Sequence, residues 1–193
     1  MHDVMAQAIS PGRVGLTRLS SAELYVVHGF VLSARTRPLR CSAIALSWLG
    51  NGWVYLALGA GSVVAAGWKA FPALLIGSLN AGLLHCVYPS IKRWFARPRP
   101  YQRDSALVPL LNVLDQHSFP SGHTMTFTAV LVPLVLAFPY LAGAAFTVGL
   151  LMAWARLASA HHYPSDVLAG AVLGASVSYP TSIYALAALR LVA

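Results

Sequence analysis

Long apolar segments separated by short polar connections make up most of the chain. A bilayer core about 30 Å thick needs roughly 20 mostly apolar residues per helix. Five segments approach that length, at about 49–68, 71–89, 121–139, 141–159 and 166–189. The pattern therefore predicts an all-α polytopic membrane helix bundle. Very short connections after the first and third spans predict antiparallel hairpins at those two places.

The N-terminal part contains shorter apolar segments. Residues 22–34 and 41–48 are apolar but too short to span a bilayer, and the polar sequence RTRPLR lies near them. We expect helices there that lie at the membrane interface or pack against the bundle. If the two segments span together, the bundle has six spans instead of five. We therefore expect one domain over 1–193, with a tail and short helices in 1–48 and the main bundle in 49–193.

The composition agrees with a membrane protein and narrows its partners. Only 9% of the 193 residues are charged and 58% are hydrophobic, whereas soluble domains carry about 25% charged residues. The formal net charge of +8 comes from basic residues that lie between apolar spans. Anionic lipid head groups or a phosphorylated substrate fit that placement better than nucleic acid does.

Two longer connections and the helix ends beside them carry most of the polar chemistry. Residues 90–120 join the second and third spans, and residues 159–166 join the fourth and fifth, so both lie on the same membrane face. Charged groups at membrane depth are costly and are usually functional. The polar side chains that converge there are Lys92, Arg99, His123, Arg156, His162 and Asp166. Such cations can hold an oxyanion, the imidazoles can transfer protons or attack, and the carboxylate can orient an imidazole.

Prolines shape both ends of the first of these connections. The sequence ARPRP at 96–100 cannot continue a helix, because a residue before proline avoids helical backbone angles, so Arg97 and Arg99 should lie on an extended strip. Pro120, Ser121 and Gly122 are typical of a helix start. Free backbone N–H groups at such a start bind anions, and the next residue, His123, would point at the bound anion.

Three motifs in this region resemble those of the type 2 phosphatidic acid phosphatase superfamily. KRWFARPRP supplies Lys92, Arg99 and Pro100 of K-x6-R-P, and PSGH is intact at 120–123. The third motif, S-R-x5-H-x3-D, matches ARLASAHHYPSD with Arg156, His162 and Asp166, although Ala155 replaces the usual serine. The motifs cover residues 92–166, and the pattern of apolar spans extends the resemblance over most of the remaining chain.

The resemblance implies a role for each matching residue. His162 would attack phosphorus and form a phosphohistidine, and Asp166 would hold its ring in the tautomer that leaves the attacking nitrogen bare. His123 would protonate the leaving oxygen and then activate water. The nonbridging oxygens would be held by Lys92, Arg99, Arg156, Ser121 and the backbone N–H of Gly122. Neither a metal nor another cofactor is required.

Several neighbouring residues have weaker claims to a role. Spacing selects His162 rather than His161 as the nucleophile, and a zinc site formed by these two and His123 lacks a regular ligand spacing. Possible secondary contacts to substrate come from Arg97, His117 and Pro120.

The expected function is hydrolysis of a phosphomonoester or diphosphate of a lipid. Small bacterial members that the chain resembles lead us to favour a polyprenyl diphosphate such as undecaprenyl diphosphate. Phosphatidylglycerophosphate, phosphatidic acid and lipid A stay open as substrates. A phosphotransferase that uses the same phosphohistidine, a catalytically inactive lipid-binding protein and a haloperoxidase-like vanadate site are the alternatives.

The expected location is a bacterial inner membrane, and the same resemblance favours an active site at the periplasmic face. The distribution of basic residues favours the cytoplasm instead, because Lys69 and Arg190 alone mark the opposite side. Several of the cations on the motif side have catalytic roles, which weakens that argument. The oligomeric state is left open by the sequence.

Overall fold

The structure, a computed structural model, describes residues 11–113 and 115–189, and this part is helical with a single isolated bridge between Pro98 and His117. The helices are α1 (Pro11–Ser33), α2 (Arg37–Leu49), α3 (Trp53–Ala66), α4 (Phe71–Phe95), α5 (Pro100–Arg103), α6 (Gly122–Ala137), α7 (Ala142–Ala158) and α8 (Pro164–Ala188). Short 3-10 turns connect α3 to α4 and α6 to α7. The predicted all-α class is confirmed. The predicted tail residues 1–10 and Arg190 lie outside the described residues.

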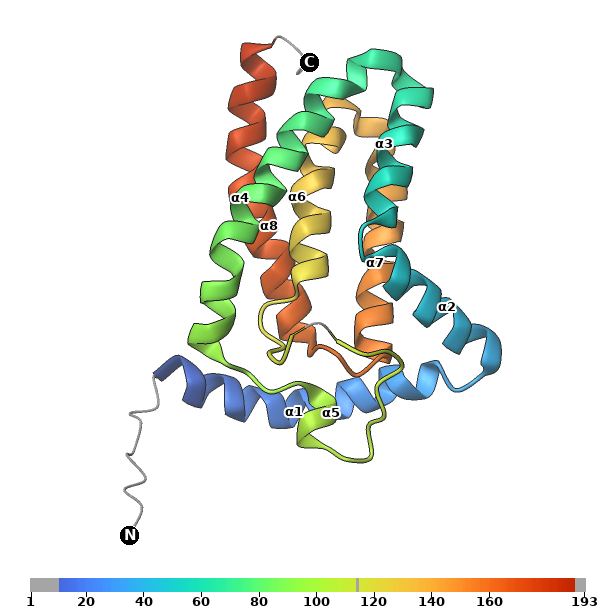
Figure 1. The fold of residues 1–193 in the computed structure, drawn as a ribbon, viewed down its shortest axis with the longest axis vertical. Helices are drawn as coiled ribbons and strands as arrows, with labels where there is room; N and C mark the ends of the chain where they lie inside the picture. The colour runs from blue at the N-terminus through green and yellow to red at the C-terminus, as the bar shows by residue number, and fades with distance from the viewer. Residues whose placement is uncertain (1–10, 114, 190–193) are drawn as a thin grey trace.

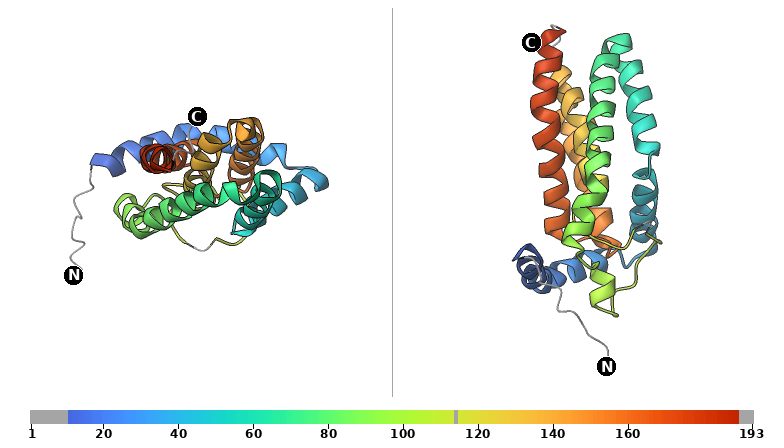
Figure 2. Two further views of the ribbon diagram at one scale, coloured as in Figure 1. Left: turned by 90° about the horizontal axis from the view of Figure 1, so that it is seen from above. Right: turned by 60° about the vertical axis from the view of Figure 1, so that its left-hand side comes forward.

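The helices α3, α4, α6, α7 and α8 run along the long axis of the molecule, and α1 lies across one end of them (Figure 1). The two turned views in Figure 2 show the same arrangement, with α6 inside the bundle. α6 packs most extensively against α8 and α4. Gly170 and Gly174 of α8 permit the approach, because an added Cβ would collide with the backbone of Ser121, just before α6, or of Met125 in α6. The α6 helix therefore holds its neighbours in a fixed register.

The long helices have the length and composition of membrane spans. Three stretches qualify, Trp53–Phe95, Pro139–Ala158 and Pro164–Ala188, and the first of them folds back on itself as α3 and α4. α6 is a shorter apolar helix. Large apolar side chains such as Phe146 and Leu168 are exposed on the outer surface, where lipid rather than water would cover them. The chain is an all-α membrane protein.

One predicted boundary was wrong. The second span was expected to end at Pro89, but α4 continues through this proline to Phe95. A proline removes one backbone hydrogen bond, which membrane helices tolerate when their neighbours hold them in place. α4 ends instead at Ala96, which adopts a left-handed conformation and donates its N–H to the carbonyl of Lys92 over 2.8 Å. Lys92 therefore lies on the last turn of a rigid helix rather than in a loop.

The N-terminal helices pack against the bundle, as the sequence predicts. Most of the short apolar segment 22–34 forms the second half of the longer α1, which ends at Ser33 and whose Val27 is fully buried while Tyr25 is 85% exposed. α2 packs against α7 and leads through Gly50, Asn51 and Gly52 into α3. Both helices therefore reach the end of the bundle where the two long connections meet.

Candidate active site

A cavity of about 630 Å³ opens at the end of the bundle that α1 crosses. It lies where the 96–121 connection meets the segment between α7 and α8. Most of the predicted site residues line it: Lys92, Arg99, Gly122, His123, Arg156 and His162. Asp166, Ser121, Arg97, His117 and Pro120 do not line it. The structure therefore brings the expected cations and imidazoles together and places the other predicted residues behind them.

Two of the cations are linked by a carboxylate that the sequence did not single out. Lys92 donates from Nζ to Oδ1 of Asp115 over 2.6 Å and to the carbonyl of His117 over 2.7 Å. Arg99 donates to the same Oδ1 over 2.9 Å and to the carbonyl of His161 over 2.8 Å. Asp115 belongs to no motif, and an isolated acidic residue in a polar loop gives no signal by itself.

Arg156 is the least compensated cation in the cavity. It lies on the last turn of α7 and is 5% exposed, and its buried Nη2 atom has no hydrogen-bond partner among the described residues. Its Nη1 lies 3.4 Å from Nε2 of His123. A buried guanidinium with a free donor is costly unless something binds it. This edge of the cavity is therefore suited to an anion.

His162 lies between α7 and α8 and is held by the backbone. Its Nδ1 is 2.8 Å from the carbonyl oxygen of Ser118, which can only accept a hydrogen bond, so Nδ1 carries the proton and Nε2 is bare. Burial, with Arg99 and Lys92 nearby, holds the pKa of His162 well below its ordinary value. The ring is therefore neutral, and Nε2 has a free lone pair.

Asp166 is further from His162 than the sequence led us to expect. Its Oδ2 lies 3.6 Å from Nδ1 of His162 and accepts the backbone N–H of Tyr163 over 2.8 Å. Its Oδ1 accepts from Nη1 of Arg97 over 2.5 Å. In this structure the carbonyl of Ser118 makes the shorter contact to His162, and Asp166 supplies a nearby negative charge. A main-chain acceptor leaves no trace in a residue pattern.

His123 meets a second residue that the sequence did not identify. Its Nε2 lies 2.8 Å from Oδ1 of Asn51, in the break between α2 and α3. Gly50 packs so closely on the ring that an added Cβ would lie 2.7 Å from Cδ2 of His123. The only available signal was a polar residue between two glycines, GNG, at the start of an apolar span.

The start of α6 presents a glycine and not a serine to the cavity. Gly122 lines the cavity, and the Tyr88 hydroxyl lies so close to it that an added Cβ would be 2.5 Å away. The Ser121 side chain is fully buried and accepts a hydrogen bond from Thr124 over 3.1 Å. Pro120 is buried beside it. Gly122 is therefore the residue of this helix start that lines the cavity, while the predicted Ser121 side chain lies outside it.

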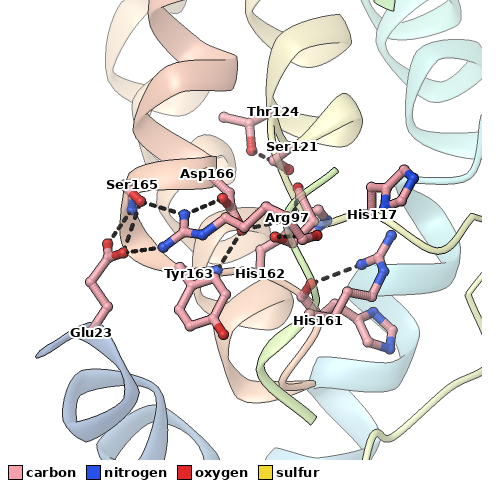
Figure 3. A network of polar contacts seen from close by, with 12 residues as sticks. Glu23, Arg97, His117, Ser121, Thr124, His161, His162, Tyr163, Ser165 and Asp166 are labelled. Carbon is pink, nitrogen blue, oxygen red and sulfur yellow. Dashed lines mark hydrogen bonds and ion pairs between the residues drawn. The ribbon is translucent and has the colours of Figure 1, made fainter. Parts of the chain in front are cut away.

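The remaining candidates take structural positions around the cavity. Arg97 points away from it, toward Glu23 and Asp166 (Figure 3). His117 contributes its carbonyl to Lys92. His161 lines the cavity and its Nε2 donates to the carbonyl of Leu111 over 2.9 Å. Within 11–113 and 115–189, no group of three or more His, Cys, Asp or Glu side chains could hold a metal ion.

Comparisons with known proteins agree with the fold and the motifs. A sequence profile of the PAP2 superfamily matches residues 71–189. A transmembrane PAP2-type phosphatidylglycerolphosphate phosphatase from Bacillus subtilis is similar in structure, with a TM-score of 0.59, 24% identity and coverage of 86% of each chain. LpxE from Aquifex aeolicus also has a TM-score of 0.59, with 26% identity over 81% of this chain and 90% of its own. No curated protein sequence matches the chain.

Proposed function

The chain belongs to the PAP2 superfamily, and from this premise we propose that it removes phosphate from a lipid phosphate or diphosphate through a phosphohistidine at His162. One observation carries the proposal. The bare Nε2 of a neutral, buried His162 belongs to a cavity that also contains Lys92, Arg99 and Arg156. A nucleophile next to concentrated positive charge is the arrangement that phosphoryl transfer requires.

The first half of the reaction forms the phosphohistidine. Nε2 of His162 attacks phosphorus in line, and the bond from phosphorus to the leaving oxygen breaks. Protonated His123 gives its proton to that oxygen, so the lipid leaves as an alcohol or, from a diphosphate, as a monophosphate. The negative charge of the entering phosphate favours the protonated form of His123.

The second half regenerates the enzyme. Neutral His123 takes a proton from a water molecule, whose oxygen attacks phosphorus and breaks the bond to Nε2 of His162. Inorganic phosphate leaves, and His162 returns to its neutral form. In both halves the three cations and the backbone N–H groups of the α6 start stabilise the charge on the nonbridging oxygens. The proposed mechanism includes no metal or cofactor.

The extent of the cavity supports a lipid substrate. Besides the cations, its lining includes Tyr55 of α3 and His85 of α4. His85 is seven residues before Lys92, which is about 10 Å along a helix at 1.5 Å per residue. A head group bound at the cations can therefore leave its tail among the spans. A polyprenyl diphosphate is our proposed substrate, with phosphatidylglycerophosphate, phosphatidic acid and lipid A as the competing ones.

Trapping of the intermediate tests the mechanism. Wild-type protein incubated with a labelled substrate should form an acid-labile, alkali-stable phosphoenzyme, and His162→Ala should form none and release no phosphate. His161→Gln is the matched control, since it alters the adjacent imidazole and should keep the phosphoenzyme. Phosphate release by His162→Ala at the wild-type rate would refute the mechanism. Assaying wild-type protein with each of the four candidate lipids ranks the substrates, and release of inorganic phosphate distinguishes hydrolysis from phosphotransfer.

We further propose that the active site faces the periplasm of a bacterial inner membrane. Ser105 is exposed in the connection next to the cavity and suits a single introduced cysteine. Cys41 and Cys86 are free and exposed, so both must first be replaced by serine. A membrane-impermeant maleimide should then label Ser105→Cys in intact spheroplasts. Labelling only after lysis would place the site in the cytoplasm.

A further inference from the structure

A buried ionic cluster lies behind His162, outside the cavity. Arg97 is at its centre, 2% exposed, and its guanidinium donates to Oε2 of Glu23 over 2.6 Å and to Oδ1 of Asp166 over 2.5 Å. It also donates to Ser20 over 3.0 Å and to Ser165 over 2.7 Å. Figure 3 shows Arg97 between Glu23 and Asp166. Arg97, Glu23 and Asp166 are not reacting groups in the proposed reaction steps.

Glu23 connects this cluster to a helix outside the motif region. It lies on α1, which crosses the end of the bundle. Besides Arg97, its carboxylate accepts the backbone N–H of Ser165 over 2.6 Å and the Ser165 hydroxyl over 2.9 Å. Ser165 is in the first turn of α8, where a carboxylate is favoured by the free N–H groups. Glu23 therefore fixes both Arg97 and the helix start that carries Asp166.

The charges in the cluster do not cancel. Arg97 contributes one positive charge, and Glu23 and Asp166 contribute one negative charge each, which leaves a net charge of −1. The side chains of Arg97, Glu23 and Asp166 are 1%, 11% and 0% exposed, so water screens them weakly. Without Glu23, Arg97 would neutralise Asp166. The imidazole 3.6 Å away would then have no net negative charge beside it.

We propose that Glu23 is a positioning residue for the reaction: acting through Arg97, it holds Asp166 in place and maintains one net negative charge beside His162. His162 becomes positively charged when Nε2 bonds to phosphorus, and a nearby negative charge stabilises that state. The inference rests on the proposed phosphohistidine. It makes α1 a part of the catalytic unit.

Glu23→Gln tests the inference, because it keeps the shape of the side chain and removes its charge. We expect kcat and the single-turnover rate of phosphoenzyme formation to fall roughly tenfold to a hundredfold, the range seen for outer partners of a reacting centre. KM should stay within about twofold, because Glu23 does not line the cavity. Glu23→Asp, which keeps the charge, should recover most of the rate. An unchanged kcat in Glu23→Gln would overturn the inference.

A matched control separates this role from the docking of α1. The same helix is joined to the 104–106 turn by His28, whose Nε2 lies 2.8 Å from Oδ2 of Asp104 in a partly exposed pair. His28→Phe removes that contact and leaves Asp166 untouched, so kcat should stay unchanged. Equal losses in His28→Phe and Glu23→Gln would mean that only the docking of α1 matters, which overturns the inference.

A further variant covers the case in which Glu23→Gln does not fold. Arg97→Lys keeps the charge of the cluster but cannot reach all four acceptors, so kcat should fall with KM unchanged, and a wild-type kcat would overturn the inference. Failure of the proposed function looks different: His162→Ala would then retain activity. Loss of activity in His162→Ala together with normal kcat in Glu23→Gln would reject the role of Glu23 alone.

Discussion

Asp115 accepts hydrogen bonds from two cations that we assign to phosphate binding, so its carboxylate competes with the substrate for them. Burial raises the pKa of this carboxyl, but Lys92 and Arg99 together lower it by more than burial raises it. The resulting pKa lies below the ordinary value of an aspartate. The group is therefore charged at neutral pH. Asp115→Asn should tighten inhibition by inorganic phosphate roughly fivefold, equivalent to about 1 kcal/mol for a partly exposed pair. Weaker inhibition would instead show that Asp115 is needed to hold the cations in place.

Asn51 should matter through His123. Its amide oxygen is the observed partner of Nε2, the nitrogen from which the leaving group would be protonated. Asn51→Leu should lower kcat about tenfold, a part of what general acid–base catalysis supplies, and should shift the pH profile of kcat. Asn112→Leu is the control, since Asn112 also lines the cavity, whereas the hydrogen-bond contacts of the His123 ring among the described residues are with Asn51 and Arg156. Equal effects of the two substitutions would argue against a specific role.

The lowered pKa of the His161 imidazole should make the stability of the protein depend on pH. Burial and Arg156 lower the pKa of His161 to about 4, whereas an unfolded histidine titrates near 6.5. Between these values the unfolded state binds the extra proton, so the free energy of unfolding decreases as pH falls through this window, by up to about 3 kcal/mol. The thermal midpoint, measured in detergent, should fall less between pH 7 and pH 4.5 for His161→Gln than for wild type. An equal difference would contradict the assignment.

At the residue scale, the sequence predicted the charged and imidazole groups of the site but missed the residues that hydrogen-bond to them. Lys92, Arg99, Arg156 and His162 occur at fixed spacings, and the structure brings them to one cavity. The partners come from elsewhere in the chain and have ordinary residue types. Asn51, Asp115 and Glu23 become recognisable only when the fold places them, and Ser118 acts through its carbonyl.

At the scale of elements, the contact between α6 and α8 holds the start of α6, which carries His123, against the start of α8, which follows His162. An added Cβ at Gly174 would lie 2.5 Å from the carbonyl of Met125. Gly174→Ala should therefore destabilise the protein by about 1–3 kcal/mol, as overpacking does, and lower its thermal midpoint. Gly59→Ala in α3 meets nothing within 4 Å and should not lower the midpoint. A similar decrease in the thermal midpoint of both variants would mean that replacing a helical glycine, and not the collision with Met125, causes the destabilisation.

The apolar runs predicted which helices exist better than where they end. The helix α4 passes through Pro89 because its neighbours hold it, and α1 begins well before the apolar segment 22–34. Helix length depends on tertiary packing, which a local pattern of residues does not contain. The effect on the site is direct, because the extra turns of α4 carry Lys92.

At the scale of the whole molecule, the described charges are concentrated at one end. α8 starts beside the cavity at Pro164 and ends at Ala188, at the opposite end of the bundle (Figure 1). A fluorescent protein that matures only in the cytoplasm, fused after the C-terminus, should therefore fluoresce if the active site faces the periplasm. A dark fusion with normal phosphatase activity would place the active site in the cytoplasm. This test is independent of the cysteine labelling.

Glu23 also bears on where the functional unit begins. The superfamily profile starts at residue 71, and all three motifs lie after that point. A protein trimmed to this boundary would keep each motif residue. It would lose the acceptor for His123 and the carboxylate that balances Arg97. Transplanting the motif-bearing helices into another scaffold would therefore require grafting α1 and the Asn51 turn along with them.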